Sequence, residues 1–335
     1  MRLPTKALQN VCRIAVTCIC TLMVFPLALM MRAVYPILPF RIGSLRSKII
    51  GHYVFDIEYY LASQRNIKRR TYDLFFLGSE PSVNLQWEKM VRRTVWVRRW
   101  YRYLWLASFC VPGGAANRIS FVSGSRDRLG VLQSAEPQFS FMPEEERKGR
   151  DYMTRLGMLP TEKYVCLIVR DAAYKVAYNE SFGLKKDWSY HNYRDTEISD
   201  YRTAIDELIK AGYWVFRMGK NVEKKLVHES AMVIDYANSA DRSDFLDIWL
   251  AANCSFCVST CTGLDEVARA FRRPAVYVNF LPLRNMVTYT PSVNAPKRLF
   301  WTTSGQELTL TEHLKASYLS SSEYDQSGIS IKDLD

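Results

Sequence analysis

Hydroxyl-bearing residues and a glycine follow an apolar run in the second half of the sequence, in a pattern typical of an anion-binding turn. The run Phe256–Ser259 leads directly into residues 260–263 (TCTG), and a helix-like stretch comes next. Hydroxyls, a conformationally free glycine and the unpaired N–H groups of a helix start favour a bound anion such as a diphosphate. The simpler interpretation makes Thr262 only an N-cap and Gly263 only a turn residue.

Charged groups at the ends of other predicted strands favour the anion site. Arg170, Arg217 and Lys220 each follow a short apolar run, and Asp235 ends another. Such runs, alternating with helix-length segments, predict a parallel sheet covered on both faces, whose ligands bind beyond the carboxyl ends of the strands. We therefore expect these groups to lie at the same edge as the Ser259–Gly263 turn, facing one cleft between two domains.

The length, net charge and cysteine content of the chain limit the class of protein. The 335 residues suffice for two domains of ordinary size. The net charge of +11 indicates a negatively charged partner, such as a membrane surface, a phosphorylated ligand or a nucleic acid. Three of the eight cysteines lie in the apolar N-terminus and three in or beside one predicted strand, which indicates a reducing compartment rather than a disulfide framework.

Several motifs with defined chemistry are missing from the sequence. No GxGxxG follows a predicted strand, and neither GxxxxGK[ST] nor GxSxG occurs. Cys254 and Cys257, with Cys261 nearby, are a poor zinc site because a strand directs the first two to opposite faces. Asp244 and Asp247 lie three apart on a predicted helix, where capping and solvation explain them. We expect an enzyme without a metal or other cofactor that acts on a phosphorylated donor.

Residues 14–31 are an uncharged apolar run with basic residues on both sides. Their number lies at the lower edge for a membrane-spanning helix, and Pro26 is expected to kink it. No small-residue cleavage site follows, so we predict a retained anchor, either spanning or inserted in the plane of the membrane. The basic residues after the run favour a cytoplasmic body.

Two features stand out in the segment after this anchor. His52 follows Gly51 at a predicted strand-to-helix junction, where it is a candidate catalytic base, although a lone histidine is more often a packing residue. Residues 84–106 form the most basic predicted helix, with Lys and Arg interleaved with Trp and Tyr. This composition suits a membrane headgroup zone and equally a domain helix with an aromatic core face. No recognised nucleic-acid motif is present, so we expect no nucleic acid partner.

Five short motifs follow one another in the second half of the chain. They are residues 191–195 (HNYRD), 212–219 (GYWVFRMG), 235–239 (DYANS), 242–248 (RSDFLDI), and 263–264 (GL) with 273–279 (RPAVYVN). In these motifs the chain resembles a bacterial family of glycosyltransferases that is defined mainly by sequence similarity. The first half matches more weakly, through residues 41–43 (RIG), Gly51, His52, Glu58 and Leu61.

The resemblance implies an α/β fold of the GT-B type, with two Rossmann-like domains facing a cleft. The donor nucleotide sugar would bind the C-terminal domain and the acceptor the N-terminal one. We predict a membrane anchor over residues 1–40, an acceptor-side domain over 41–142, a linker helix over 143–160, a donor-binding domain over 161–319 and a flexible tail over 320–335.

The sequence thus predicts a membrane-associated glycosyltransferase at a bacterial inner membrane, with no metal. It would use a nucleotide diphosphate sugar and a glycan or lipid-linked acceptor, with an anionic membrane surface as a further partner. An alternative is a catalytically silent protein of the same fold that binds glycan or lipid as a scaffold. The predicted base is His52 or Glu58. The predicted donor-binding residues are Arg170, Arg194, Arg217, Lys220, Asp235, Ser259, Thr262, Gly263 and Glu266.

Overall fold

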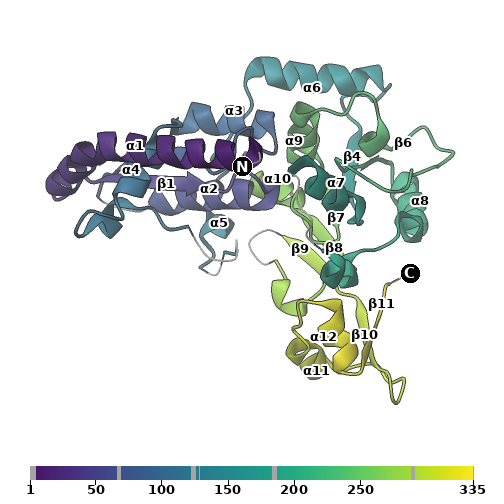
Figure 1. Cartoon of the computed structure of the whole chain (residues 1–335). Coiled ribbons are helices and arrows are strands. Elements are labelled where there is room, and N and C mark those ends of the chain that lie inside the picture. The colour runs from purple at the N-terminus through teal and green to yellow at the C-terminus, as the bar shows by residue number, and fades with distance from the viewer. Residues whose placement is uncertain are drawn as a thin grey trace. The chain divides into compact units, whose positions relative to one another are not determined.

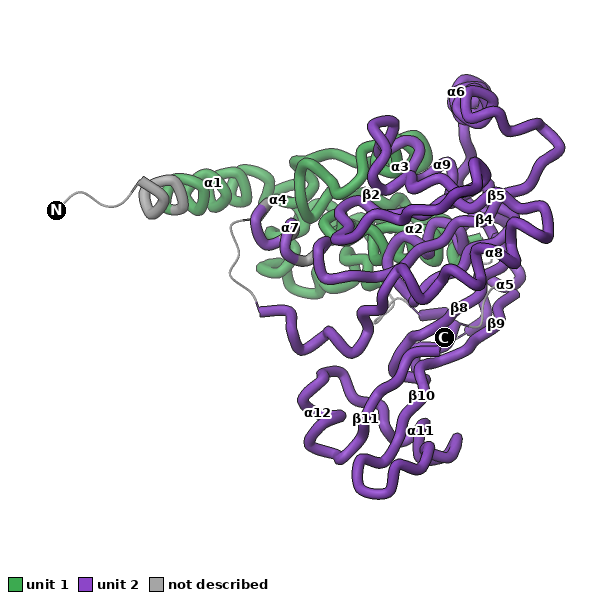
Figure 2. The backbone as a smooth tube through the Cα atoms, turned by 90° about the vertical axis from the view of Figure 1, so that its right-hand side faces the viewer, with its two compact units in different colours: residues 1–125 green, residues 126–335 purple. Residues whose placement is uncertain are grey.

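The computed structural model describes residues 5–65, 69–121, 126–127, 129–182, 187–287 and 291–334. The chain divides into two compact units, Met1–Ser125 and Arg126–Asp335, coloured separately in Figure 2. Each unit contains a parallel sheet with helices. The predicted α/β class, with two α/β units and an N-terminal apolar helix, is therefore confirmed.

Unit 1 contains a three-stranded sheet in the order β1-β2-β3, with all its pairings parallel. Its elements are α1 (Thr5–Val34), β1 (Phe40–Leu45), α2 (Ile50–Gln64), β2 (Tyr72–Leu77), α3 (Leu85–Thr94), β3 (Trp96–Val97), α4 (Tyr101–Ala107) and the 3-10 turn η1 (Gly114–Asn117) (Figure 1). Residues after η1 extend the sheet, since Ile119 N–H donates to the Ile42 carbonyl at 2.8 Å. The sheet places the β1–α2 and β2–α3 loops at one edge.

The predicted basic helix over residues 84–106 is wrong, because the structure breaks it into α3, β3 and α4. Asn84 caps α3 by accepting from Trp87 N–H at 2.8 Å. The β-branched residues Val95 and Val97 favour extended backbone, and Val97 pairs with Phe75 of β2. The aromatic residues separate accordingly: Trp87 is fully buried, whereas Trp96 is 61% exposed.

Unit 2 contains a six-stranded sheet in the order β6-β5-β4-β7-β8-β9, with every pairing parallel. Its strands are β4 (Lys163–Ile168), β5 (Tyr213–Arg217), β6 (Val233–Ile234), β7 (Phe256–Ser259), β8 (Ala275–Val278), β9 (Ser292–Ala295), and the separate pair β10 (Arg298–Trp301) and β11 (Ile329–Lys332). Numbered from β4, the strand order is 3-2-1-4-5-6, which is the order of a doubly wound Rossmann-type sheet. The order reverses between β4 and β7, so the crevice at their carboxyl ends is the expected ligand site.

Unit 2 also contains helices and short 3-10 turns. They are α5 (Val131–Ser134), α6 (Pro143–Arg155), α7 (Ala173–Phe182), α8 (Arg202–Lys210), α9 (Asp244–Asn253), α10 (Asp265–Ala270), α11 (Leu310–Lys315), α12 (Ser321–Gln326), η2 (Ser189–Arg194), η3 (Ile198–Tyr201), η4 (Tyr236–Asn238) and η5 (Leu283–Asn285). Helix α6 lies against α9, and α11 and α12 lie beside β10 and β11 (Figure 1). The core between sheet and helices includes Val165, Val215 and Ile205.

Three predicted boundaries differ from the structure. The first domain, predicted to end at residue 142, ends at Ser125. Helix α6, predicted as a linker, packs within unit 2, where a Cβ at Gly149 would lie 2.0 Å from the ring of Trp249 in α9. The flexible tail predicted over residues 320–335 is wrong, since α12 and β11 fold there. Tyr324 is fully buried in a cluster with Leu299 and Ile329, and this apolar burial holds the segment in place.

Candidate functional site

The reversal of strand order in unit 2 brings Arg170 next to the turn after β7. Ile168 of β4 pairs with Ser259 of β7, and Thr260 N–H donates to the Ile168 carbonyl at 3.2 Å. Beyond the strand ends, Arg170 N–H donates to Thr260 Oγ1 at 3.0 Å. The structure therefore places Arg170 and the turn at the same edge of the sheet, as the sequence predicted.

A second arginine from the 191–195 motif joins this edge. Arg194 Nη2 donates to the Cys261 carbonyl at 2.7 Å, and Arg170 Nε lies 2.8 Å from Asp195 Oδ1. Burial lowers the pKa of Arg170, and the positive charge of Arg194 lowers it further, against the opposing effect of Asp195. Within the described part of the chain Arg194 has no carboxylate partner. Among the described residues, Asp195 thus pairs with Arg170 alone, and the charge of Arg194 is left for an anion.

The turn after β7 is organised by a buried carboxylate that the sequence analysis did not select. Asp265 Oδ2 accepts from Ser259 Oγ at 2.7 Å and from Thr262 N–H at 2.9 Å. Burial raises the pKa of Asp265, and the charge of Arg269 opposes this rise. Because Asp265 already accepts these two hydrogen bonds, a diphosphate would have to use Arg170, Arg194 or other groups of the turn.

The turn itself is strained at a residue other than glycine. Cys261 has a φ of 61°, and its N–H donates to Ser259 Oγ at 3.1 Å. A left-handed backbone at a β-carbon-bearing residue costs free energy and is found preferentially at functional sites. Thr262 is not the N-cap of α10, a position held by Leu264. Thr262 Oγ1 is instead buried and has no hydrogen-bond partner among the described residues.

Arg217, the third predicted donor-binding arginine, lies at the expected carboxyl edge of the unit 2 sheet, but its side chain is buried. Its side chain is 1% exposed, 3.2 Å from Asp235 Oδ1 and 3.7 Å from Asp171 Oδ2. Asp235 also accepts from Leu226 N–H at 2.9 Å. Lys220 lies farther out, 3.9 Å from Asp244 Oδ1. The structure therefore gives Arg217 and Asp235 an internal ion pair that orders the loop after β5.

Glu266 has a similar internal environment in the first turn of α10. Its side chain is 9% exposed and forms an ion pair with Arg269 on the same helix. Gly263 lies in the turn between these groups and β7. Of the nine predicted donor-binding residues, Arg170 and Arg194 are the two that combine charge, partial exposure and a position at the switch point.

The candidate base His52 lies in the first turn of α2, at the carboxyl edge of the unit 1 sheet. Burial lowers the pKa of His52, the charge of Arg46 lowers it further, and Asp56 opposes both. Arg46 holds Asp56 through two hydrogen bonds of 2.6 and 2.7 Å. Glu58, the other candidate, is 1% exposed within α2. A half-buried, neutral imidazole is chemically able to accept a proton at pH 7.

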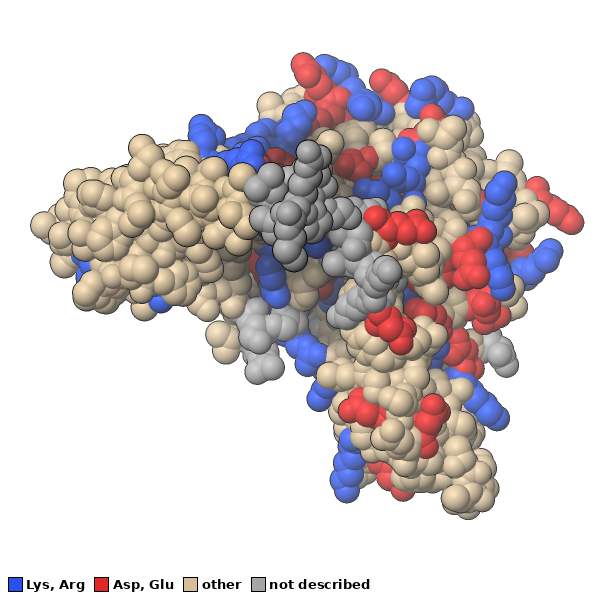
Figure 3. Space-filling model, in the orientation of Figure 1, with Lys and Arg blue, Asp and Glu red and all other residues tan. Residues whose placement is uncertain are grey.

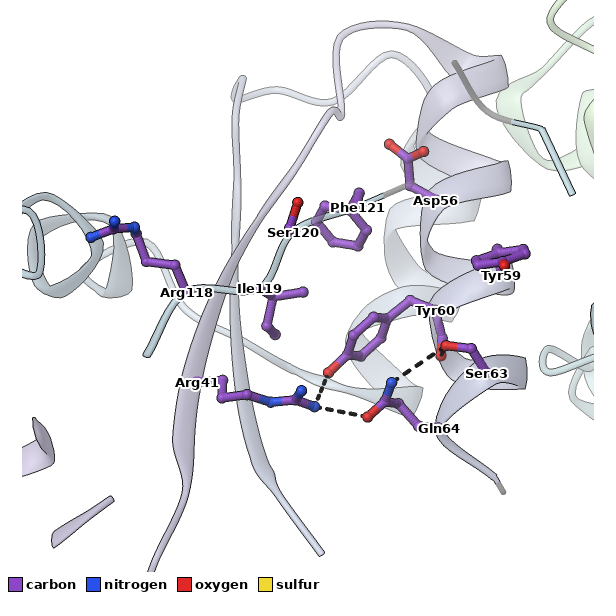
Figure 4. A pocket seen from close by; sticks show the side chains of 10 residues that line it. All are labelled: Arg41, Asp56, Tyr59, Tyr60, Ser63, Gln64, Arg118, Ile119, Ser120 and Phe121. Atoms are coloured by element: carbon purple, nitrogen blue, oxygen red, sulfur yellow. Dashed lines mark hydrogen bonds between the residues drawn. The ribbon is translucent and has the colours of Figure 1, made fainter. Parts of the chain in front are cut away.

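A cavity of about 160 Å³ runs along α2 in unit 1. Asp56 lines one end of it, and Arg41, Tyr60 and Gln64 meet at the other (Figure 4). Arg41 Nη2 donates to Tyr60 Oη at 2.6 Å and to Gln64 Oε1 at 2.8 Å. The wall opposite α2 comes from residues 118–121. This polar cavity is a candidate site for a hydroxyl-rich ligand.

Sequence reasoning missed Asp56, Asp195 and Asp265 as members of these sites. A signal existed for Asp56, because it lies four residues after His52 and so shares its helix face. Asp195 stands in the 191–195 motif, but its ion pair with Arg170 is seen only in the fold. Asp265 lies three residues after Thr262, close enough in sequence to be considered as a partner of the turn. Across the described residues, no group of three or more His, Cys, Asp and Glu side chains is arranged to hold a metal ion.

Comparison with known proteins gives structural similarities alone. No family model matches the sequence, and no curated protein matches it. A glycosyl transferase family 9 protein from Veillonella parvula is 8% identical, with 77% of this chain and 86% of that chain covered and a TM-score of 0.48. The E. coli ADP-heptose lps heptosyltransferase II is 13% identical, with 76% and 90% covered and a TM-score of 0.40.

A further similar structure is the E. coli heptosyltransferase WaaC with ADP-2-deoxy-2-fluoro heptose. It is 13% identical, with 77% of this chain and 94% of that chain covered and a TM-score of 0.39. These solved neighbours are glycosyltransferases. The particular family indicated by the sequence motifs stays a prediction.

Proposed function

We propose that the protein is a glycosyltransferase at a bacterial inner membrane, with a cytoplasmic catalytic body. It transfers a sugar from a nucleotide diphosphate sugar to a cell-surface glycan or lipid-linked precursor. The observation that carries the proposal is the 3-2-1-4-5-6 sheet with Arg170 and Arg194 at its switch point. Doubly wound sheets bind nucleotides there, and paired arginines supply the charge that a diphosphate requires.

The transfer needs positive charge where the leaving diphosphate forms. As the bond between the anomeric carbon and the diphosphate oxygen breaks, negative charge grows on that oxygen. Arg194 and Arg170 offset this charge in place of a metal ion. Arg194 is the principal group because Asp195 already neutralises part of the charge of Arg170.

On the acceptor side, the hydroxyl must lose a proton as its oxygen bonds to the anomeric carbon. We assign this proton to the imidazole of His52, whose lowered pKa keeps it neutral at pH 7. The cavity along α2, which begins beside Asp56, is the proposed acceptor site. Tyrosine, glutamine and arginine side chains there suit the hydroxyls of a sugar or the charge of an acidic glycan.

The alternative function is a catalytically silent protein of the same fold that binds glycan or lipid at the membrane. One observation favours it: Asp265 accepts the hydrogen bonds that the turn after β7 would otherwise offer to a phosphate. A silent protein would keep the fold and the acceptor cavity without turning over a donor.

The test is donor binding and turnover by the purified protein. A panel of nucleotide diphosphate sugars is screened by thermal shift, since a ligand that binds only the folded state raises Tm. The stabilising donor is then supplied with a label, and release of the nucleotide diphosphate is measured with and without a membrane glycolipid extract. Binding with turnover supports the transferase, whereas binding without turnover, or no stabilisation by any donor, contradicts sugar transfer and favours the silent protein.

A further inference from the structure

One part of helix α1 packs against the rest of unit 1, and the other part is exposed. Ala28 and Met31 are 5% exposed and pack against Leu104 and Ala107 of α4. Toward the N-terminus the helix leaves the protein surface, where Leu22 is 71% exposed. Within the apolar segment Val11–Val34, an 18-residue window has a mean hydropathy of 2.4 and only 11% of it is buried. A helix that is apolar on all sides and bare requires a nonaqueous environment.

The apolar surface continues from α1 onto neighbouring segments of unit 1. In Figure 3 the surface over α1 and α4, at the left, is almost free of charged side chains, whereas Lys and Arg gather over α3. Ile37, just past α1, is 84% exposed, and Phe109, just past α4, is 56% exposed. One continuous apolar surface thus spans two helices.

Arginines paired with aromatic rings border this surface. The guanidinium carbons of Arg32 and Arg69 lie 5.8 and 5.5 Å from the centre of the Tyr35 ring. Arg118 lies 4.0 Å from the centre of the Phe109 ring. Arginine with tyrosine or phenylalanine is the composition of a membrane interface, where the cations meet anionic headgroups.

The bare part of α1 is too short to cross a bilayer. The uncharged and uncovered residues 14–23 extend about 15 Å at 1.5 Å per residue, against about 30 Å of hydrocarbon. For α1 to cross the bilayer, residues 24–31 would have to enter the hydrocarbon as well. Helix α4 packs on these residues and would enter with them, although it carries the exposed Arg102. Charged groups on α4 would then enter hydrocarbon, which is unfavourable.

We propose that α1 inserts into one leaflet of an anionic bilayer and lies along it, with the apolar surface of α1 and α4 facing the lipid. The N-terminus then stays on the same side of the membrane as unit 1. This inference rests on the membrane attachment in the proposed function and adds its topology. In this orientation Arg13 and Arg32, at the two ends of the uncharged run, both reach headgroups of the same leaflet.

The topology is tested with a membrane-impermeant maleimide and the full-length chain. Cys12, Cys18, Cys20 and Cys110 are changed to Ser, and either Asn10→Cys or Leu85→Cys is added. Leu85, 58% exposed in α3, reports the side of unit 1. The protein is added to sealed vesicles of phosphatidylglycerol and phosphatidylethanolamine, with reagent either outside or in the lumen. Labelling of both cysteines from outside supports the proposal, and labelling of Asn10→Cys from the lumen or from neither side overturns it.

A substitution pair tests the surface itself. Leu22→Asp, on the bare part of α1, is expected to reduce vesicle flotation at least tenfold, whereas Leu159→Asp, at a leucine 61% exposed in unit 2, leaves it unchanged. Truncating residues 1–34 would be a poorer test because it removes Ala28 and Met31 from the core. Unchanged flotation of Leu22→Asp overturns the proposal.

The experiment separates failure of this inference from failure of the proposed function. A protein that turns over donor in solution but does not bind vesicles overturns the membrane orientation and leaves sugar transfer standing. A dimer that buries α1 and ignores vesicles, detected by sedimentation in lipid-free buffer, would identify a second copy of the chain as the occupant of this surface and likewise overturn the proposal.

Discussion

Arg194 and Arg217 provide the sharpest test of the donor site, because both are arginines of the same unit in different environments. Arg194 is half-buried and donates to the Cys261 carbonyl, whereas Arg217 is 1% exposed between Asp235 and Asp171. We predict that Arg194→Ala weakens donor binding and leaves the fold stable. We predict that Arg217→Met, which keeps the apolar volume but removes the charge, destabilises the fold and leaves donor binding by the folded protein unchanged.

The magnitudes follow from these environments. A charge-assisted hydrogen bond to phosphate contributes about 1.5 to 3 kcal/mol, so Arg194→Ala should raise the donor Kd about 10- to 140-fold. Removing one partner of a buried ion pair costs about 3 to 5 kcal/mol. The partners Asp235 and Asp171 keep 15% and 17% exposure, so we take the lower end for Arg217→Met. In a unit of this size about 3 kcal/mol lowers Tm by roughly 6 to 12 °C.

Calorimetric titration with the stabilising donor and thermal unfolding by circular dichroism measure the two effects on each variant. Arg194→Lys is the matched control, since it keeps the charge but not the planar geometry, and should fall between the parent and Arg194→Ala. The reasoning is refuted if Arg194→Ala binds donor as the parent does, or if Arg217→Met melts at the temperature of the parent.

Two further predictions concern titratable groups. His52→Ala should lower kcat about a hundred- to ten-thousand-fold with an unchanged donor Kd, and the acid limb of the parent pH–rate profile should lie below pH 6.5. The control is His228→Ala, at a histidine of unit 2 whose Nε2 lies 3.0 Å from Asp206 Oδ1. Normal turnover and pH dependence of His52→Ala, as expected of this control, would exclude His52 as the base. Burial raises the pKa of Asp247 to about 6, so the folded state keeps a proton that the unfolded chain loses near pH 4. The contribution of Asp247 to stability should therefore fall as pH rises from about 4 to 6, so the stability of Asp247→Asn relative to the parent should rise over this range in urea unfolding, whereas that of Asp244→Asn should not. A difference between Asp247→Asn and the parent that does not change with pH contradicts the assignment.

The sheet of unit 2 was predictable because each of its main strands is a short apolar run that can be recognised in the local sequence. Apolar runs ending in Arg170, Asp235 or the 259–263 turn alternate with capped helices, and this alternation admits few topologies other than a parallel sheet. The edge that carries the candidate site followed from the same pattern. Strand order was not predicted, because it depends on which faces bury one another rather than on any single run.

The environment of each charged group was not predictable from local sequence. Arg217 and Arg170 look alike as residues at strand ends, yet one is enclosed by Asp235 and Asp171 and the other lies partly exposed beside Asp195. These partners lie far apart along the chain, and ion pairing depends on distances of a few ångströms. Sequence reasoning could therefore locate the edge but not separate binding arginines from structural ones.

The motifs that carried the family resemblance show why such residues need not be catalytic. Tyr236, from the 235–239 motif, donates its hydroxyl to Asp247 Oδ1 at 3.0 Å, and Arg242 Nη1 donates to Asp247 Oδ2 at 2.8 Å. Both Asp247 and Arg242 belong to the 242–248 motif. Tyr236 is fully buried and stacks edge-on to Tyr152 of α6. The two motifs thus form one polar cluster that links α9 to α6, so these motif residues stabilise the core of unit 2 and need not contact a substrate.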